Sequence, residues 1–121
     1  KLQYGLAALS LVSHSALITA TANDQDGQLI FAQQVWGLGQ AGDILLAIST
    51  SGNSQNVLLA AKTAQAKNML VIGLTGGTGG KLAGLCDITI SVPSDNVAQI
   101  QEMHLPIYHH ICASVEAHFF A

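Results

Sequence analysis

Three short apolar runs restrict the fold of this chain more than any other feature of its sequence. They span residues 43–49 (DILLAIS), 69–75 (MLVIGLT) and 87–93 (DITISVP), and each has the length of a β-strand. The first two are almost continuously apolar, which is typical of strands covered on both faces of a sheet. The segments between the runs are too long for tight hairpins, so the runs predict parallel strands.

The segment between the first two runs has the period of a helix. Its apolar residues recur at positions i, i+3, i+4 and i+7, and they are Val57, Ala60, Ala61 and Ala64. Ser54 or Asn56 suits the start of this helix, and Lys67 and Asn68 suit its end. Residues 54–68 are therefore expected to form the crossover helix of a β-α-β unit.

The N-terminal part of the chain has weaker signals. Residues 31–38 (FAQQVWGL) have a helical pattern that ends at Gly39 and Gly42. Residues 6–12 form a weaker fourth apolar run, which we interpret as a strand. The pattern of residues 15–26 favours neither a helix nor a strand.

The C-terminal segment, residues 94–121, contains no glycine and begins with the capping candidates Ser94, Asp95 and Asn96. It is expected to form one long helix. A kink is expected at Pro106, because proline removes one backbone donor and crowds the preceding turn. Together these elements predict a single α/β domain in which helices flank a parallel sheet.

The low charge content limits the partners of this chain. Only 9% of its residues are charged, against roughly 25% in a typical soluble domain, so we expect self-association. The formal net charge is −3 and there is no arginine, so no basic patch is expected and nucleic acid is not a direct ligand. No apolar run reaches the roughly 18 residues of a membrane span, and the opening segment has no clear signal-cleavage site. Cys86 and Cys112 lack metal-ligand or CxxC spacing and are expected to be small buried side chains in a reducing cytoplasm.

Residues 49–56 (STSGNSQN) lie where the first strand ends and the crossover helix begins. Ligands of open α/β sheets bind at this edge, where free amide groups and the helix dipole attract anions. The loop adds four hydroxyl groups, from Ser49, Thr50, Ser51 and Ser54, and no basic side chain, so it is expected to hold a phosphate monoester. Neither GxxxxGKS/T nor GxGxxG occurs, which argues against a nucleotide cofactor. The alternative is a Ser/Gly-rich turn that only caps the helix.

A second glycine-rich loop, residues 75–80 (TGGTGG), follows the second strand. Beyond Thr78 it offers no hydroxyl group that could cap a helix. We interpret it as a plain turn.

Several of these segments together resemble one known family. Residues 42–54 (GDILLAISTSGNS) resemble the signature of SIS (sugar isomerase) domains, and residues 79–84 (GGKLAG) and 100–104 (IQEMH) are similar in order and spacing to its phosphoheptose isomerase branch. The resemblance implies a three-layer α/β SIS fold with a long C-terminal helix. It also implies that residues 1–121 are the C-terminal two-thirds of a SIS domain, without its N-terminal helices, its first strand and its catalytic glutamate.

The resemblance implies three sets of site residues. The four hydroxyl side chains of the 49–54 loop would hold the phosphate of the substrate, and Asn23 and Asp24 would contact the sugar. Gln101 and His109, on the terminal helix, would serve the reacting end of the sugar, with His109 as general acid or base. Several members of the family bind zinc there, so the resemblance makes these two residues the expected zinc ligands.

The histidines of the terminal helix fall on different sides of it. On an ideal helix, His104 lies on the apolar stripe with Ile107 and Ile111, so it is expected to be packed or at an interface. His109 points away from that stripe, which agrees with the role that the resemblance implies. Neither glutamate of the chain matches the family's catalytic base.

The implied function is phosphosugar aldose/ketose isomerisation, from sedoheptulose 7-phosphate to D-glycero-D-manno-heptose 7-phosphate, by a homotetramer. Two alternatives stay open. A related tetrameric SIS protein binds the replication initiator without catalysis, and Met103 resembles it, whereas the histidine at position 109 favours the enzyme. A sugar-phosphate sensor without turnover is the third hypothesis.

Overall fold

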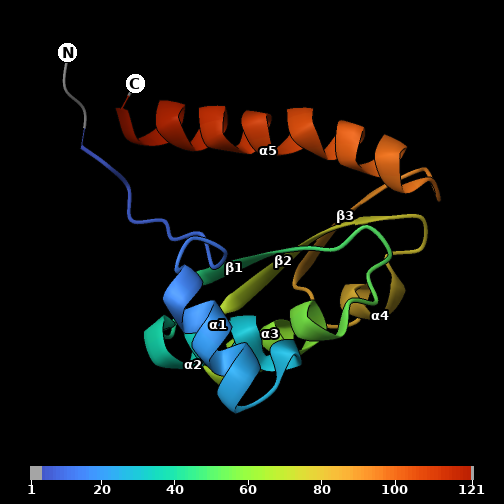
Figure 1. Cartoon of the computed structure of the whole chain (residues 1–121). Coiled ribbons are helices and arrows are strands. Elements are labelled where there is room, and N and C mark those ends of the chain that lie inside the picture. Colours follow the sequence, from blue (N-terminus) through green and yellow to red (C-terminus); the bar gives the residue numbers. More distant parts are fainter. Residues whose placement is uncertain (1–3, 121) are drawn as a thin grey trace.

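The computed structural model describes residues 4–120 and contains a sheet of three parallel strands with helices on both sides (Figure 1). The strands run in the order β1-β2-β3, and they are β1 (Ile44–Ile48), β2 (Leu70–Gly76) and β3 (Ile88–Val92). All three apolar runs are therefore confirmed as parallel strands. Their carboxyl ends lie at the same edge of the sheet, where the loops that follow β1 and β2 begin.

Helices form two layers around this sheet. In chain order they are α1 (Ser15–Asp24), the 3₁₀-helix η1 (Gly27–Leu29), α2 (Ile30–Leu38), α3 (Gln55–Ala66), α4 (Gly80–Ala83) and α5 (Val97–Phe120). Figure 1 shows α1, α2 and α3 together on one side of the sheet and α5 on the other. The predicted α/β arrangement with three layers and a long C-terminal helix is confirmed.

The main core lies between the sheet and α3. The alanines predicted to form the inner face of this helix are buried, and Ala61 and Ala64 are fully inaccessible to solvent. They meet Leu45 of β1 and Val71 of β2 in the same core cluster. Small side chains on α3 allow its backbone to approach the sheet closely, which fixes the position of the loop that precedes it.

Residues 6–12 do not form a strand, so that prediction was wrong. They have no regular structure, and the side chains of Leu6, Leu9 and Val12 are exposed. A strand needs a neighbour that completes its hydrogen bonds, and within residues 4–120 these residues pair with no strand of the sheet. Apolar content alone therefore did not determine their structure.

Residues 15–24, which the sequence pattern did not assign, form α1. The helix starts because His14 caps it: the Leu17 amide donates a hydrogen bond of 3.2 Å to His14 Nδ1. Histidine is an uncommon capping residue, which explains why the start of this helix was not recognised.

The long helix α5 begins at Val97, where Asn96 Oδ1 accepts a hydrogen bond of 3.1 Å from the Gln99 amide. It continues without interruption through Pro106, and Figure 1 shows no sharp bend along it, so the expected kink is not visible there. It is anchored through Ile100 and His104, which are its two buried residues.

One face of the sheet is only partly covered. The outward side chains of β1, Ile44, Leu46 and Ile48, are 59%, 40% and 48% exposed, because α5 packs on β2 and β3. The expectation that β1 is covered on both faces therefore fails within the described part of the chain. The cysteines also differ from expectation, since Cys86 is half-buried and Cys112 is exposed.

Candidate functional site

The loop of residues 49–54 leaves the sheet at the end of β1 and is held in place by β2. The Ser49 amide donates to Leu74 O (3.0 Å), and the Gly76 amide donates to Thr50 O (3.0 Å). These backbone bonds extend the β1–β2 ladder past the end of β1. The first half of the loop is therefore as rigidly placed as the strand itself.

Hydrogen bonds within this loop fix the positions of three of its serine side chains. Ser49 is buried, and its hydroxyl donates a hydrogen bond of 3.0 Å to Ser54 Oγ. Ser51 Oγ accepts a hydrogen bond of 3.1 Å from the Asn53 amide. Ser51 and Ser54 are thus acceptors in these two hydrogen bonds, which do not use their own hydroxyl protons.

The start of α3 tests the interpretation that these residues only cap a helix. Ser54 is the N-cap residue, and its side chain forms no hydrogen bond to the amides of α3 among the described residues. Asn56 Oδ1 accepts only from the adjacent Val57 amide (2.9 Å). Capping is therefore not what the Ser54 hydroxyl does here. The open amide end of a 12-residue helix, with the positive end of its dipole, is a favourable place for an anion.

Two glycines let the second glycine-rich loop pack against the first. Gly52 has a φ of 65°, and a Cβ atom there would lie 1.9 Å from Gly79 O. Gly80 has a φ of 56°, and a Cβ atom there would lie 2.4 Å from Ser51 O. Positive φ values of this kind favour glycine. The two loops therefore interlock through their backbones.

Asn53 joins the same two loops through its side chain. Its Oδ1 accepts a hydrogen bond of 3.1 Å from the Lys81 amide, and its Nδ2 donates to Ser51 O (3.0 Å). The 75–80 loop, which the sequence presented as a plain turn, thus supports the 49–54 loop. The glycine spacing was visible in the sequence, but the partner of each glycine was not.

A pocket of about 230 Å³ opens between the loops at the carboxyl ends of the strands. It is lined by Thr50 and Ser51 of the first loop, by Gly76 and Thr78 of the second, and by the segment that joins β3 to α5. That last segment contributes Ser94 and Asp95, and the first turn of α5 contributes Val97 and Ile100. The pocket therefore combines two predicted phosphate-binding residues with side chains that the sequence analysis did not connect to them.

The other predicted site residues, Ser49 and Ser54 among them, do not line this pocket. Asn23 and Asp24 are exposed at the end of α1, where Asn23 Nδ2 donates to Asp24 Oδ1 (2.8 Å). Gln101 and His109 are exposed on α5 and line neither of the two best-defined pockets. Ser49, Thr50, Ser51 and Ser54 share one loop, whereas Asn23, Asp24, Gln101 and His109 line no described pocket with them.

Gln101 and His109 do not by themselves fit a zinc ion. Residues eight positions apart on a helix are separated by about 12 Å along its axis, and zinc bonds are about 2 Å long. No group of three metal-ligating His, Cys, Asp or Glu side chains occurs in the described part of the chain.

His104 is packed, as predicted from its place on the apolar stripe. Its side chain is 3% exposed, and its Nε2 lies 2.9 Å from Thr75 O. Because a carbonyl oxygen only accepts, Nε2 carries the proton and donates this hydrogen bond. The contact ties α5 to the end of β2, next to the pocket.

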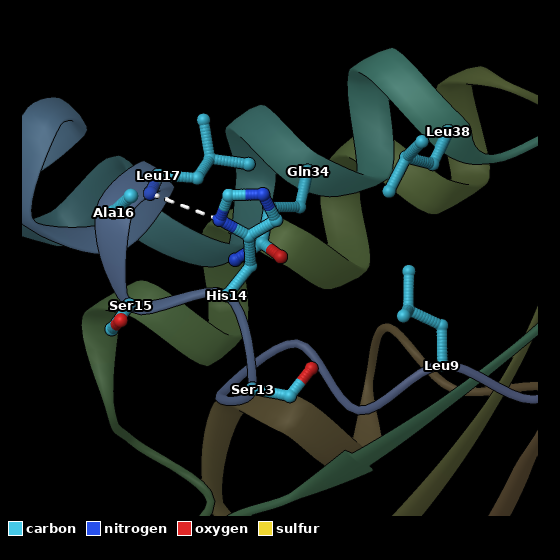
Figure 2. A pocket seen from close by; sticks show the side chains of 8 residues that line it. All are labelled: Leu9, Ser13, His14, Ser15, Ala16, Leu17, Gln34 and Leu38. Carbon is cyan, nitrogen blue, oxygen red and sulfur yellow. Dashed lines mark hydrogen bonds between the residues drawn. The ribbon is translucent and has the colours of Figure 1, made fainter.

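A second pocket, of about 340 Å³, lies between the N-terminal segment and α2 and shares no residue with the first. Figure 2 shows its lining, which includes Leu9, His14, Leu17, Gln34 and Leu38. The polar groups seen there have structural partners: His14 caps α1, and the buried Gln34 donates through Nε2 to two backbone carbonyl groups. We assign this pocket to the packing of α1 on α2.

The half-buried Cys86 shows no sign of reactivity. Burial is the main cause that raises the pKa of its thiol, while a hydrogen bond with Thr89 opposes the change. A raised pKa keeps the thiol protonated at neutral pH, and the thiolate is the reactive form. The Cys86 side chain packs against the backbone of Gly73. A Cβ atom at Gly73 would lie 2.5 Å from Cys86 Sγ.

The fold and the loops define an α/β domain with its ligand edge at the carboxyl ends of parallel strands. The sequence model of the SIS domain matches residues 3–76. The chain belongs to the SIS domain family.

Individual relatives agree with this assignment. The chain is 47% identical over 118 residues to the phosphoheptose isomerase of Alteromonas mediterranea, and 50% identical over 115 residues to that of Laribacter hongkongensis. These matches cover 95% and 93% of this chain but 60% and 59% of the relatives. The chain thus spans about 60% of the length of the curated relatives it matches.

Solved structures give the same result. Phosphoheptose isomerase from Neisseria gonorrhoeae matches with a TM-score of 0.88 and 43% identity, covering 90% of this chain and 62% of that one. A phosphoheptose isomerase from Francisella tularensis matches with a TM-score of 0.82 and 48% identity, covering 85% of this chain and 56% of that one. The resemblance to the phosphoheptose isomerase branch is confirmed.

Proposed function

We propose that this chain provides the phosphate-binding part of a phosphosugar aldose/ketose isomerase. The substrate we propose is sedoheptulose 7-phosphate, which is converted to D-glycero-D-manno-heptose 7-phosphate. The observation that carries the proposal is the set of ordered hydroxyl groups at the uncapped start of α3. The similarity of the chain to phosphoheptose isomerases supports the choice of substrate.

The proposed role of the 49–54 loop is to hold the phosphate without a basic side chain. Ser51 and Ser54 donate hydroxyl protons, Thr50 adds a third hydroxyl group at the pocket, and the dipole of α3 favours the negative charge. Ser49 acts indirectly, because its hydroxyl donates a hydrogen bond to Ser54 Oγ. Binding of the phosphate fixes the distance of the reacting carbons from the loop.

Isomerisation also needs groups that move protons at the other end of the sugar. A base must remove the proton beside the carbonyl group, and an acid must serve the oxygens as the enediol forms. We propose His109 for the acid role, with Gln101 as a hydrogen-bonding partner of the sugar. Because both lie outside the pocket, they act only when further protein surrounds α5. Neither Glu102 nor Glu116, both exposed on α5, is assigned the base role.

Asn23 and Asp24 complete the proposal as contacts of the sugar hydroxyl groups. They lie at the end of α1, directly before η1, and η1 packs against α3. Asn23 and Asp24 do not line the pocket itself. Their role therefore depends on how far the bound sugar extends from the phosphate.

We also propose that the protein is a homotetramer in which α5 takes part in the interface. Apolar side chains are exposed on this helix, including Leu105 (46%), Val115 (39%) and Phe119 (61%). Exposed apolar surface of this kind favours contact with another protein surface. No described helix is long and apolar enough to cross a membrane, and a cytoplasmic location is part of the same proposal.

A sugar-phosphate sensor without turnover is the second candidate, and one observation favours it. The described pocket contains hydroxyl groups but no paired acid and base, since His109 lies elsewhere. A sensor would need only the phosphate site. The initiator-binding function has no such observation in its favour beyond Met103.

The experiment that separates these functions is a turnover assay. Full-length protein is incubated with sedoheptulose 7-phosphate, and the aldose product is followed by NMR. An isomerase produces it at a rate that rises with enzyme concentration. Binding of the sugar phosphate without product would instead establish the sensor.

A further inference from the structure

Asp95 adds a carboxylate to the pocket at the strand ends. Among the described residues that line this pocket, it is the only one with a carboxylate. The same pocket is lined by the hydroxyl-bearing residues Thr50, Ser51, Thr78 and Ser94. Hydroxyl groups can donate hydrogen bonds, whereas an ionised carboxylate only accepts them. The pocket thus combines hydroxyl donors with one carboxylate acceptor.

The surrounding residues leave the Asp95 carboxylate open to a ligand. Asp95 is exposed, and one of its carboxylate oxygens packs against the backbone of Gly77, where a Cβ atom would lie 2.5 Å from Asp95 Oδ1. The hydroxyl group of the preceding residue is already hydrogen-bonded elsewhere. Ser94 Oγ donates to Gln99 Oε1 (2.9 Å) and accepts from the Asn96 amide (3.1 Å). The carboxylate therefore keeps its acceptor positions.

The hydroxyl groups and the carboxylate of this pocket suit different parts of one ligand. A phosphate monoester carries nearly two negative charges at neutral pH, so a carboxylate repels it and hydroxyl donors attract it. A sugar hydroxyl group has a proton to donate, and a carboxylate is its strongest acceptor in a protein. The phosphate is therefore directed to the 49–54 loop, and a hydroxyl group is directed to Asp95.

We propose that Asp95 is a specificity-determining residue, which accepts a hydrogen bond from a hydroxyl group of a polyhydroxylated phosphate monoester. This inference rests on the proposed function, because it takes the phosphate to lie on the 49–54 loop. It extends that function by naming the residue that distinguishes a sugar phosphate from inorganic phosphate.

The test compares two ligands on full-length protein by calorimetric titration, with sedoheptulose 7-phosphate and with inorganic phosphate. Asp95→Ala should weaken binding of the sugar phosphate about tenfold or more, because a hydrogen bond to a charged group is lost. Binding of inorganic phosphate should stay the same or become stronger, because a repelling charge is gone. Asp95→Asn keeps one acceptor oxygen and should give an intermediate loss.

Asp43→Asn is the matched control, because it removes the same charge at the opposite end of β1 and keeps an oxygen that can accept from the Gln40 amide. It should change neither affinity. Thermal unfolding of each variant confirms that it is folded. If wild-type protein binds both ligands and the Asp95 variants keep the wild-type ratio of affinities, the role of Asp95 is wrong while the phosphate site stands. If wild-type protein binds neither ligand, the proposed function and this inference both fail.

Discussion

The Ser49 hydroxyl donates a 3.0 Å hydrogen bond to Ser54 Oγ across the loop that joins β1 to α3. Ser49 is 5% exposed, whereas Ser54 is exposed. A buried group thus contacts a surface group, and Ser54 Oγ is the acceptor of this hydrogen bond. The contact joins the rigid end of the strand to the first residue of the helix.

Ser49→Ala should therefore affect stability and binding together. Loss of this hydrogen bond should lower the free energy of unfolding by about 1 kcal/mol. The affinity for a sugar phosphate should fall less than in Ser54→Ala, because Ser49 is buried and is proposed to act only through Ser54. Urea denaturation and calorimetric titration measure the two effects. A Ser49→Ala protein with wild-type stability would show that the hydrogen bond does not form in solution.

The contact between the two glycine-rich loops predicts a large effect at Gly52. Gly52→Ala forces a positive φ on alanine and places its Cβ atom 1.9 Å from Gly79 O, so the free energy of unfolding should fall by more than about 2 kcal/mol. Gly37→Ala is the control, because a Cβ atom in α2 meets nothing within 4 Å. It should leave stability unchanged or raise it by up to about 1 kcal/mol. Equal denaturation curves for the two variants would contradict the interlocked loops.

The strands and α3 were predictable because their signals are local. The apolar run of residues 69–75 has the length and composition of a buried strand. The alanines of α3 recur with the period of a helix that buries one face on the sheet. The hydroxyl-rich loop was predictable for the same reason, since it follows a strand directly.

What the sequence did not reveal depends on contacts between distant residues. Gly52 meets Gly79 and Asp95 meets Gly77 only after the chain has folded, and no spacing rule relates these positions. Residues 6–12 have the composition of a strand but no strand to pair with in the described chain. The position of His109 relative to the loop is also a tertiary property, because the residue lies beyond the part of α5 that packs on the sheet.

Two histidines of α5 should respond in opposite ways to the same substitution. His104→Gln disturbs a buried hydrogen bond to Thr75 O, so its thermal midpoint should fall by several degrees. His109 is exposed, so His109→Gln should unfold like wild type while its isomerisation rate falls about 100-fold or more. Thermal scans and the NMR turnover assay are run on both variants. Full activity of the His109 variant would favour the sensor over the enzyme.

The exposed apolar side chains of α5 predict an oligomer in solution. Light scattering should give a mass of four chains at micromolar concentration. Replacement of Phe119 by Ser should shift the distribution toward smaller species, because this side chain is 61% exposed in the single chain. A monodisperse monomer of the wild-type protein would refute the proposed interface.

The central claim is that the 49–54 loop binds the phosphate of a sugar phosphate. Calorimetric titration of full-length protein with sedoheptulose 7-phosphate tests it directly, using Ser51→Ala and Ser54→Ala, with Ser13→Ala as a control whose hydroxyl bonds Ser10 O outside this loop. Each loop variant should lose about ten- to a hundredfold in affinity, which corresponds to roughly 1.5–3 kcal/mol for one hydrogen bond to a charged group. The control should bind like wild type. Wild-type affinity in both loop variants would contradict the account, because the phosphate would then have to bind elsewhere.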